Sequence, residues 1–400
     1  MKIFSRLITF VVIIAILGFA AFKFGLIDIR QFPKPEGLKT VTLNCNYHGQ
    51  KLAIQENLYD SIDNYYKSNP KKRFMSYESY VSEAKEDKTL EDLTGKIEVK
   101  GRSLGLNPDQ TADLSTCFVQ NIPYDSAKAK VVLSNSPSDK LTKITNNYYF
   151  DRFPYETLYD NEGICTDKSY LEAALLKQMG YGTALLTFDI EHHMAVGIEV
   201  PNGYSSFNTG YSYIETTNTG YKVGQLPIIN TDNGGASQLG LNKLSGGINS
   251  GNIIPELPQS NFSPPTQVIK VADGKDYNRI IEITNKNNKI QEVSGEINSL
   301  SKEIASYKHQ VQNSEGQAVS AKNQLNTAET KLNEAKNIYE QDSSEQNYQA
   351  YQQAYNEYQN TYAETKGVID NYDSAVSVYN AKVDELNRLI DEYNSLVQSD

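Results

Sequence analysis

Three residue types that together perform thiol chemistry occur in order between Gly163 and Thr217. Cys165 begins a stretch with helical spacing, His193 begins an alternating stretch typical of a strand, and Glu215 lies in a second alternating stretch. A thiol, an imidazole and a carboxylate are the nucleophile, the general base and the orienting acid of a catalytic triad. We therefore take these three residues as the candidate catalytic set.

The stretch that follows Cys165 predicts a helix with one apolar face, which ends at Gly180. The N-terminus of a helix carries partial positive charge and unpaired N–H groups, which favour a thiolate over a thiol. The same N–H groups can stabilise the oxyanion that forms when sulfur attacks a carbonyl. Asp167 in the first turn suits the helix dipole, but its negative charge opposes thiolate formation.

Two adjacent histidines compete for the role of base. In the predicted strand of residues 193–200, His193 shares its face with the small Ala195 and Gly197. Small residues leave room for another element, and we expect the helix of the cysteine to lie there. His192 falls on the opposite face, among the buried aliphatic residues, so His193 is the predicted base.

The composition excludes some classes of site. The net charge of −11 argues against a nucleic-acid partner, because neutralising phosphates requires clustered Lys and Arg. Beyond one adjacent pair, the four histidines show no spacing typical of metal ligands, so we expect no metal and no cofactor.

The chain has three cysteines, Cys45, Cys117 and Cys165. A disulfide between the first two would leave Cys165 as the free thiol that a nucleophile requires. In the alternative, Cys117 is a small buried hydrophobic residue of a predicted helix. We slightly favour this alternative, because the sequence does not fix the distance between Cys45 and Cys117.

Residues 7–27 are apolar except for Lys23, and about 20 such residues span a bilayer. We predict an uncleaved transmembrane signal anchor, with Lys2 and Arg6 favouring a cytoplasmic N-terminus and the bulk of the chain outside the cytoplasm. The alternative is a signal peptide cleaved at the small-x-small sequence of residues 18–20, which would give a secreted protein.

The residues upstream of the site predict supporting elements. Alternation from Thr40 predicts a strand with its turn at His48-Gly49. The polar interval 124–155 is predicted to be a loop. Residues 228–275 are rich in Gly, Asn, Ser and Pro and predict a linker, with one further strand at 268–271. Helical spacing occurs at residues 58–66, 77–84 and 108–122.

Residues 276–400 predict a coiled coil with two heptad seams. Asp and Ser residues between 341 and 345 can cap a second helix, so we predict an antiparallel hairpin with arms roughly 75–85 Å long. In this hairpin Ala328 lies near Tyr358, which sets a small residue against a large one. The seams consist of Ile283, Ile290, Ile297, Ile304, Val311, Ala318, Leu325 and Leu332, and of Tyr348, Tyr355, Tyr362, Ile369, Val376, Val383, Ile390 and Val397.

Several short motifs occur in a characteristic order around the candidate triad. Through them, residues 40–227 resemble the transglutaminase-like superfamily of papain-type cysteine enzymes, above all a microbial, largely archaeal branch of membrane-associated or secreted proteins. The motifs are Phe118 to Tyr124, Phe153 to Leu158, Cys165 with Asp167, Ala173 to Leu176, Met179 to Tyr181, His193 to Gly197, and Glu215 to Thr217.

The resemblance implies an α+β fold in which the helix of the cysteine packs on an antiparallel sheet. It implies Cys165 as nucleophile, His193 as general base and acid, and Glu215 in the place of the superfamily's usual Asp. It also suggests Gln120 as a side-chain oxyanion donor. Ile164 and Thr166 replace the acidic residues that flank the cysteine in the branch.

We therefore expect a membrane-anchored, extracytoplasmic thiol enzyme that acts on amide or peptide bonds through a cysteine thioester. Water as acceptor would make it a cysteine peptidase or amidase, and an amine would make it an acyl transferase. The alternatives are a catalytically inactive surface-binding module and a docking protein that acts through its coiled coil. The expected partners are the membrane, a protein or peptide substrate, and a protein bound by the hairpin.

Overall fold

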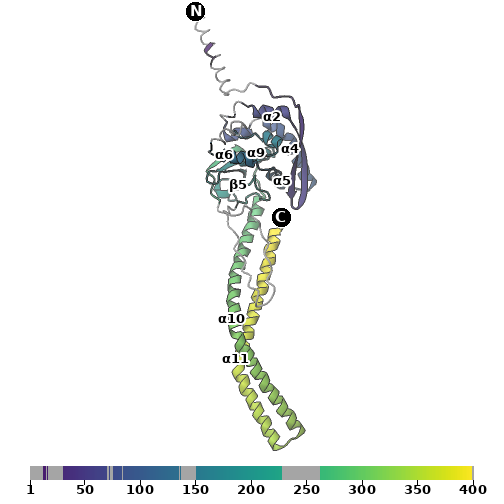
Figure 1. Ribbon diagram of the computed structural model, residues 1–400, viewed down its shortest axis with the longest axis vertical. Coiled ribbons are helices and arrows are strands. Elements are labelled where there is room, and N and C mark those ends of the chain that lie inside the picture. Colours follow the sequence, from purple (N-terminus) through teal and green to yellow (C-terminus); the bar gives the residue numbers. More distant parts are fainter. Residues whose placement is uncertain are drawn as a thin grey trace, which may run out of the picture. The chain divides into compact units, whose positions relative to one another are not determined.

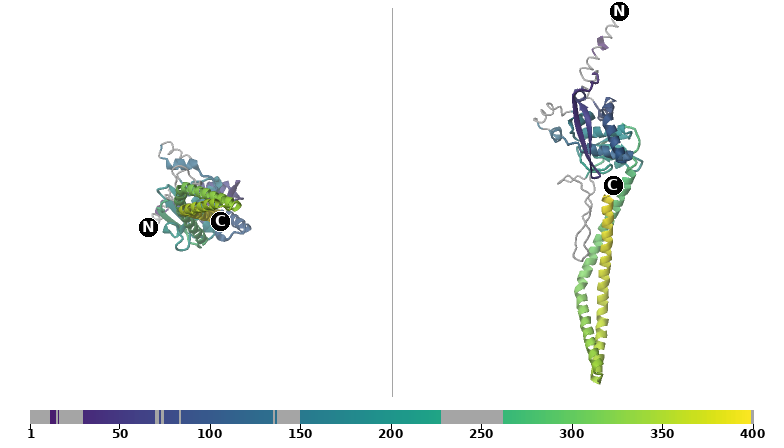
Figure 2. Two further views of the ribbon diagram at one scale, coloured as in Figure 1. Left: turned by 90° about the horizontal axis from the view of Figure 1, so that it is seen from below. Right: turned by 90° about the vertical axis from the view of Figure 1, so that its right-hand side faces the viewer.

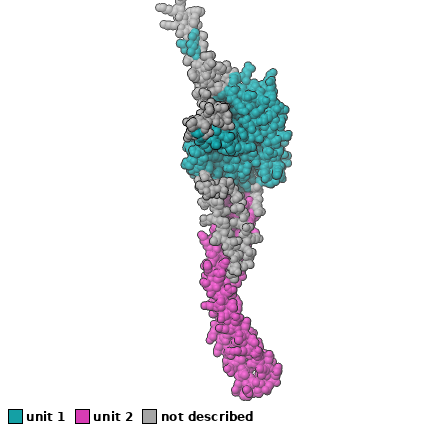
Figure 3. Space-filling model, viewed as in Figure 1, with its two compact units in different colours: residues 1–236, 259–285 teal, residues 237–258, 286–400 magenta. Residues whose placement is uncertain are grey.

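The computed structural model describes residues 12–14, 16, 30–69, 72, 75–82, 84–134, 136, 150–227 and 262–398. The chain divides into two compact units (Figure 3). The first comprises residues 1–236 and 259–285 and is an α+β unit. The second comprises residues 237–258 and 286–400, and its described residues form a helical hairpin.

The predicted anchor at residues 7–27 falls outside the described residues, apart from residues 12–14 and 16, which are helical. Within the part of the chain that the structure describes, no helix has both the length and the apolarity to cross a membrane.

The first unit begins with a β-hairpin. Strands β1 (Leu38–Tyr47) and β2 (Gln50–Tyr59) pair antiparallel, and every second residue at the end of β1 is buried. His48 and Gly49 form the turn with φ of +49° and +78°, as in the tight turns that fit the twist of a hairpin. The predicted strand and turn are thus confirmed.

A four-stranded antiparallel sheet carries the candidate base, and the candidate acid Glu215 directly follows one of its strands. Its strand order is β5 (Tyr211–Ile214), β4 (His193–Glu199), β3 (Thr183–Phe188) and β6 (Gln267–Ala272). All six residues of the inner strand β3 are buried. Strand β6 lies inside the predicted linker, so the globular unit takes in the end of that segment because β6 hydrogen-bonds to β3.

Helices surround α9 (Cys165–Gln178), which packs against α4, α5, α8 and strand β4 (Figure 1). Eleven of its residues are buried, including the charged Asp167, Lys168 and Glu172, so the prediction of a single apolar face is wrong. Helix α6 occupies part of the interval predicted to be a loop. The other helices of this unit are α2 (Asp60–Lys67), α3 (Tyr77–Ser82), α4 (Ala84–Ser103), α5 (Pro108–Gln120), α6 (Ser126–Leu133) and α8 (Pro154–Asp160).

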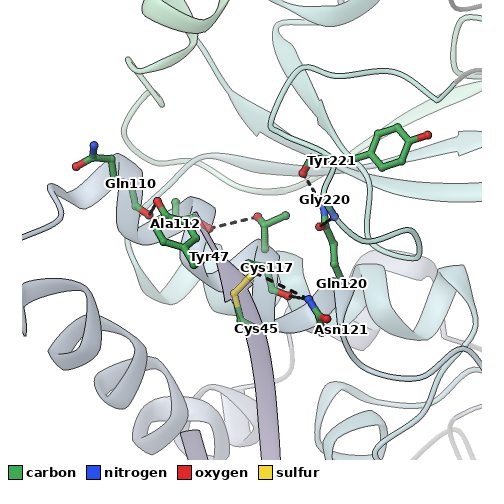
Figure 4. Close-up of a disulfide and its surroundings, with 10 residues drawn as sticks. Cys45, Tyr47, Gln110, Ala112, Cys117, Gln120, Asn121, Gly220 and Tyr221 are labelled. Carbon is green, nitrogen blue, oxygen red and sulfur yellow. Dashed lines mark hydrogen bonds between the residues drawn. A yellow bond between two sulfur atoms is a disulfide. The ribbon is translucent and has the colours of Figure 1, made fainter. Parts of the chain in front are cut away.

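A disulfide joins β1 to α5 (Figure 4). Cys45 and Cys117 are bonded, with their Cα atoms 5.6 Å apart, and our preference for a reduced Cys117 was wrong. Cys45 is on the inward side of β1, where α5 packs, so the two thiols meet. The bond closes a loop across 72 positions, which corresponds to about 4 kcal/mol of stabilisation if its effect is on the entropy of the unfolded chain.

The second unit confirms the predicted hairpin. Helices α10 (Ile280–Gln341) and α11 (Glu345–Gln398) run side by side in both views of Figure 2. Their 62 and 54 residues correspond to about 93 and 81 Å, so one arm is longer than predicted. Ion pairs between the arms fix the antiparallel register, namely Lys289–Glu392, Lys382–Glu303, Lys322–Asp373 and Lys331–Glu357.

Packing differs along the hairpin. Near the open end, large residues such as Ile297, Val311 and Leu386 form a buried cluster. Toward the connection between the helices only small seam residues such as Ala328 are buried, while Tyr355 of the facing seam stays 42% exposed. The predicted pairing of small with large residues therefore buries the alanines but leaves tyrosines of the second seam at the surface.

Candidate active site

Cys165 is the first residue of α9 and is a free thiol. Cys165 is 9% exposed, so it is largely buried but keeps some contact with solvent. The main-chain N–H of Ile164, which precedes the helix, donates to a carboxylate oxygen of Asp167 at 3.2 Å. This bond holds the backbone just before the helix begins. The main-chain N–H groups of Cys165 and Thr166 lie in the first turn, where no carbonyl of the same helix accepts a hydrogen bond from them.

The charge of Asp167 is compensated by two cations. Lys128 of α6 donates to both carboxylate oxygens at 2.8 Å, and the pair is buried. Arg152 adds a main-chain hydrogen bond of 2.8 Å and a side-chain contact of 3.4 Å. The expected opposition of Asp167 to a Cys165 thiolate is therefore weakened by neighbours that the sequence does not reveal.

His193 is the first residue of β4, and its ring lies between the thiol and a carboxylate. Nε2 is 3.2 Å from Oε2 of Glu215 and 3.3 Å from the hydroxyl of Tyr213. His193 also interacts with the Cys165 thiol and contributes to its pKa shift, and the partners of Nε2 leave Nδ1 as the nitrogen free to face the thiol. His192 is exposed in the turn before the strand, with φ of +49°.

The helix of the cysteine does not cover the face of β4 that we expected. Helix α9 packs on the side of Met194 and Val196, and its Ser169 hydroxyl donates to the Met194 carbonyl at 3.1 Å. On the other side, a Cβ atom on Gly197 would come within 2.8 Å of the Tyr211 side chain. His193 reaches Cys165 because it is the first residue of the strand. The space that we expected beside the small residues Ala195 and Gly197 does not account for this pairing.

Glu215 follows β5 directly and is buried among donors. Its Oε2 accepts the Tyr213 hydroxyl at 2.6 Å in addition to His193. Its Oε1 accepts the main-chain N–H groups of Thr217 at 2.7 Å and Asn218 at 3.2 Å, together with the Thr217 hydroxyl. Burial alone would raise the pKa of Glu215, but the bonds from His193, Thr217 and Tyr213 outweigh it and hold the pKa below its usual range.

The thiol and the imidazole have opposite pKa shifts. Burial opposes the thiolate of Cys165, but hydrogen bonding to His193 and to the Met194 main chain lowers its pKa overall. Burial also opposes the imidazolium of His193, yet its bonds to Cys165 and Glu215 raise its pKa to about 10. Both pKa shifts favour the pair of thiolate and imidazolium over the neutral pair, and the low pKa of Glu215 favours the carboxylate that holds the imidazolium.

The family comparison covers the segment that contains the three candidate residues. A family model described as a transglutaminase-like domain matches residues 106–218, which include Cys165, His193 and Glu215. Residues 106–218 form a transglutaminase-like domain. The match does not extend to β1, β2, β6 or the helical hairpin. No curated protein and no solved structure matches the chain.

Gln120 of the transglutaminase-like domain does not occupy the predicted place of an oxyanion donor. Its Nε2 donates to the carbonyl of Glu215 at 2.9 Å. Figure 4 shows its contacts with the loop, where Nε2 also donates to the Tyr221 carbonyl at 2.9 Å and Oε1 accepts the Gly220 N–H at 3.0 Å. Both amide hydrogens are therefore engaged by the loop after β5. The first-turn N–H groups of α9 are better placed for an oxyanion.

Sequence reasoning missed Tyr213, which contacts both His193 and Glu215 in the transglutaminase-like domain. A signal was available, because residues two apart on a strand point to the same face. Phe188 and Phe262 add aromatic contacts to the His193 ring, with centroids 6.4 and 5.9 Å away. In the described part of the chain, no group of three or more His, Cys, Asp or Glu residues is arranged to hold a metal ion.

Proposed function

We propose that the protein is a thiol enzyme that acts on amide or peptide bonds through a thioester on Cys165. The observation that carries this proposal is the contact of 3.2 Å between His193 Nε2 and the buried Glu215 carboxylate, beside the Cys165 thiol, which interacts with the same imidazole. An imidazole held between a thiol and a carboxylate activates the thiol and can return a proton to a leaving group. The transglutaminase-like match of residues 106–218 supports the same chemistry.

The proposed reaction has two halves. The Cys165 thiolate attacks the amide carbonyl carbon, and the carbonyl electrons move to oxygen, where the N–H groups at the start of α9 stabilise them. The intermediate collapses with loss of the amine, which takes a proton from the His193 imidazolium, and a thioester remains. Neutral His193 then removes a proton from the acceptor, which attacks the thioester and releases the thiolate.

The acceptor decides between two reaction classes. With water as the acceptor the product is a carboxylic acid, and the protein is a peptidase or amidase. With an amine the product is a new amide, and the protein is an acyl transferase. Incubating the full-length protein with glutamine-containing peptides and a fluorescent primary amine separates the two, because mass spectrometry distinguishes hydrolysed from amine-linked products.

We also propose that residues 7–27 anchor the chain in a membrane and that the enzyme lies outside the cytoplasm. The disulfide between Cys45 and Cys117 supports this, because disulfides persist mainly in oxidising compartments. The test is acid quenching of expressing cells, followed by denaturation and alkylation with a maleimide polymer. One modified thiol per chain supports the proposal, and three would contradict it.

Alkylation of Cys165 tests the activated thiol directly. Iodoacetamide should modify it at pH 6 far faster than a free peptide thiol, and His193→Ala should remove this advantage. His192→Ala is a matched control, because this neighbour is exposed and should leave the rate unchanged. If wild-type Cys165 reacts no faster than a peptide thiol, the hypothesis of a thiol enzyme is wrong, and an inactive binding module becomes the better interpretation.

A further inference from the structure

We propose that Gln120 is a positioning residue that holds the Glu215 carboxylate in place and that Lys168 fixes Gln120 to the helix of the nucleophile. This inference rests on the proposed function, since it concerns the same triad. It assigns to Gln120 a role different from the oxyanion donor that the sequence suggested.

The contacts of Gln120 span the loop that follows Glu215. The side chain is 3% exposed, and its amide bonds to the main chain of Glu215 at one end of the loop and to Gly220 and Tyr221 at the other. Between these ends, the N–H groups of Thr217 and Asn218 hold Oε1 of the carboxylate. One amide therefore closes the loop whose backbone orients Glu215.

Gln120 is itself held by a buried cation. Lys168 lies on α9 three positions after Cys165, and its Nζ donates to the carbonyls of Gln120 at 3.1 Å and Ile122 at 2.8 Å. The last carbonyls of a helix lack partners within the helix, and a cation there also complements the helix dipole. Lys168 is fully buried, and both of these partners are uncharged carbonyls.

These hydrogen bonds complete a closed loop of contacts that links the nucleophile, the base and the acid. From Cys165 the path follows α9 to Lys168, crosses to Gln120 at the end of α5, and continues to Glu215 and to His193, which interacts with the thiol. The separation between nucleophile and carboxylate is thus set by two packed helices as well as by the loop. Removing the hydrogen bonds of Gln120 should displace the Glu215 carboxylate. The protonated form of His193 would then be less favoured, and so would the Cys165 thiolate that it stabilises.

Gln120→Met in the full-length protein tests this role, because it keeps the length of the side chain and removes all three hydrogen bonds. We expect the iodoacetamide rate at Cys165 near pH 6 to fall about tenfold, with the acid limb of the pH profile displaced upward by about one unit. Combining it with Lys168→Met should give a smaller total effect than the sum of the two single changes, since both act through one chain of contacts.

Thr116→Val is the matched control. Thr116 lies four residues earlier on α5, is also buried, and its hydroxyl donates to Glu172 at 2.7 Å instead of to the loop. Urea unfolding should show that it destabilises the protein, while its alkylation profile stays that of the wild type. A purely structural role for Gln120 predicts no displacement of the acid limb for either variant, and that result would overturn the inference.

The two proposals fail in different ways. If wild-type Cys165 has the acid limb of an ordinary thiol, the proposed function is wrong and the role of Gln120 falls with it. If the wild type shows an activated thiol and Gln120→Met leaves the limb unchanged, only the positioning role is refuted. An upward displacement in Gln120→Met that is missing in Thr116→Val supports both.

Discussion

Glu215→Gln should uncouple the candidate triad while nearly preserving its shape. The carboxamide oxygen can replace Oε1, which accepts from Thr217 and Asn218. Its NH2 group would then face His193 Nε2, where a second donor disfavours a protonated nitrogen. The imidazole would lose the charge that favours its protonated form, and Cys165 would lose the imidazolium that favours its thiolate.

The geometry sets the size of this effect. Unit charges 3.2 Å apart, the distance between Nε2 and Oε2, interact with about 5 kcal/mol at an effective dielectric constant of 20. If the amide dipole and local rearrangement recover about half, some 2–3 kcal/mol of support for the ion pair is lost, which is roughly a 50-fold decrease in thiolate population. Glu215 is buried and the His193 side chain is only 15% exposed, which limits screening by salt.

The decrease in thiolate population is measured as the rate at which iodoacetamide modifies Cys165 between pH 5 and 9. Mass spectrometry follows the modification. The variant should be slower by about 50-fold near pH 6 and approach the wild type only where an ordinary thiol ionises. Glu172→Gln is the control, because it removes another buried glutamate from the same helix as the cysteine without touching His193. A folded Glu215→Gln protein that reacts within about threefold of the wild type at pH 6 would refute the reasoning.

Three further changes test the surroundings of the site by urea unfolding. Replacing Cys45 and Cys117 together by alanine should cost about 4 kcal/mol, and a loss below about 1 kcal/mol would mean that packing alone holds this loop. Burial raises the pKa of Glu172 to about 8, so the folded chain keeps a proton that the unfolded chain releases near pH 4.5. The wild type should therefore lose stability relative to Glu172→Gln as the pH rises from 4.5 to 8, and equal pH dependence of the two proteins would contradict this. Lys128→Met leaves a buried carboxylate in the first turn of α9 without its strongest partner and should cost about 3 kcal/mol, whereas the exposed Lys130→Met should cost almost nothing.

Features with local signals could be predicted from the sequence. The turn at His48-Gly49 follows an alternating strand, and both parts of this signal lie within ten residues. The heptad repeat within α10 and within α11 indicates that each helix packs against another helix. The hairpin could therefore be predicted without knowledge of long-range contacts. The predicted start of a helix at Cys165 rested likewise on neighbouring residues.

Features that depend on distant neighbours could not be predicted. Strand β3, residues 183–188, is buried on both faces, so it lacks the alternation that identifies a half-buried strand. Helix α6 shows no apolar stripe, and its buried Lys128 is held by Asp167, 39 positions away. The strand predicted at 268–271 is confirmed as β6, but its place in the sheet depends on its pairing with the distant β3, which the sequence did not show.

The candidate site shows the same division. The order of thiol, imidazole and carboxylate was visible in the sequence, and the structure brings His193 and Glu215 together. The positions of Gln120 and Glu215 are 95 apart, and no local pattern shows that they are hydrogen-bonded. The choice of His193 over His192 agrees with the structure although the face expected to meet α9 was the wrong one.

The disulfide also determines what can happen to the nucleophile under oxidation. It consumes two of the three thiols of the chain, so Cys165 has no second thiol in the same molecule with which to pair. Oxidation of Cys165 therefore gives first a sulfenic acid or a mixed disulfide with an external thiol, both of which added thiols reverse, whereas further oxidation to a sulfinic acid is not reversed by thiols. Because a strong reductant would also open the Cys45–Cys117 bond, only mild reduction should restore the nucleophile and leave the support of α5 intact.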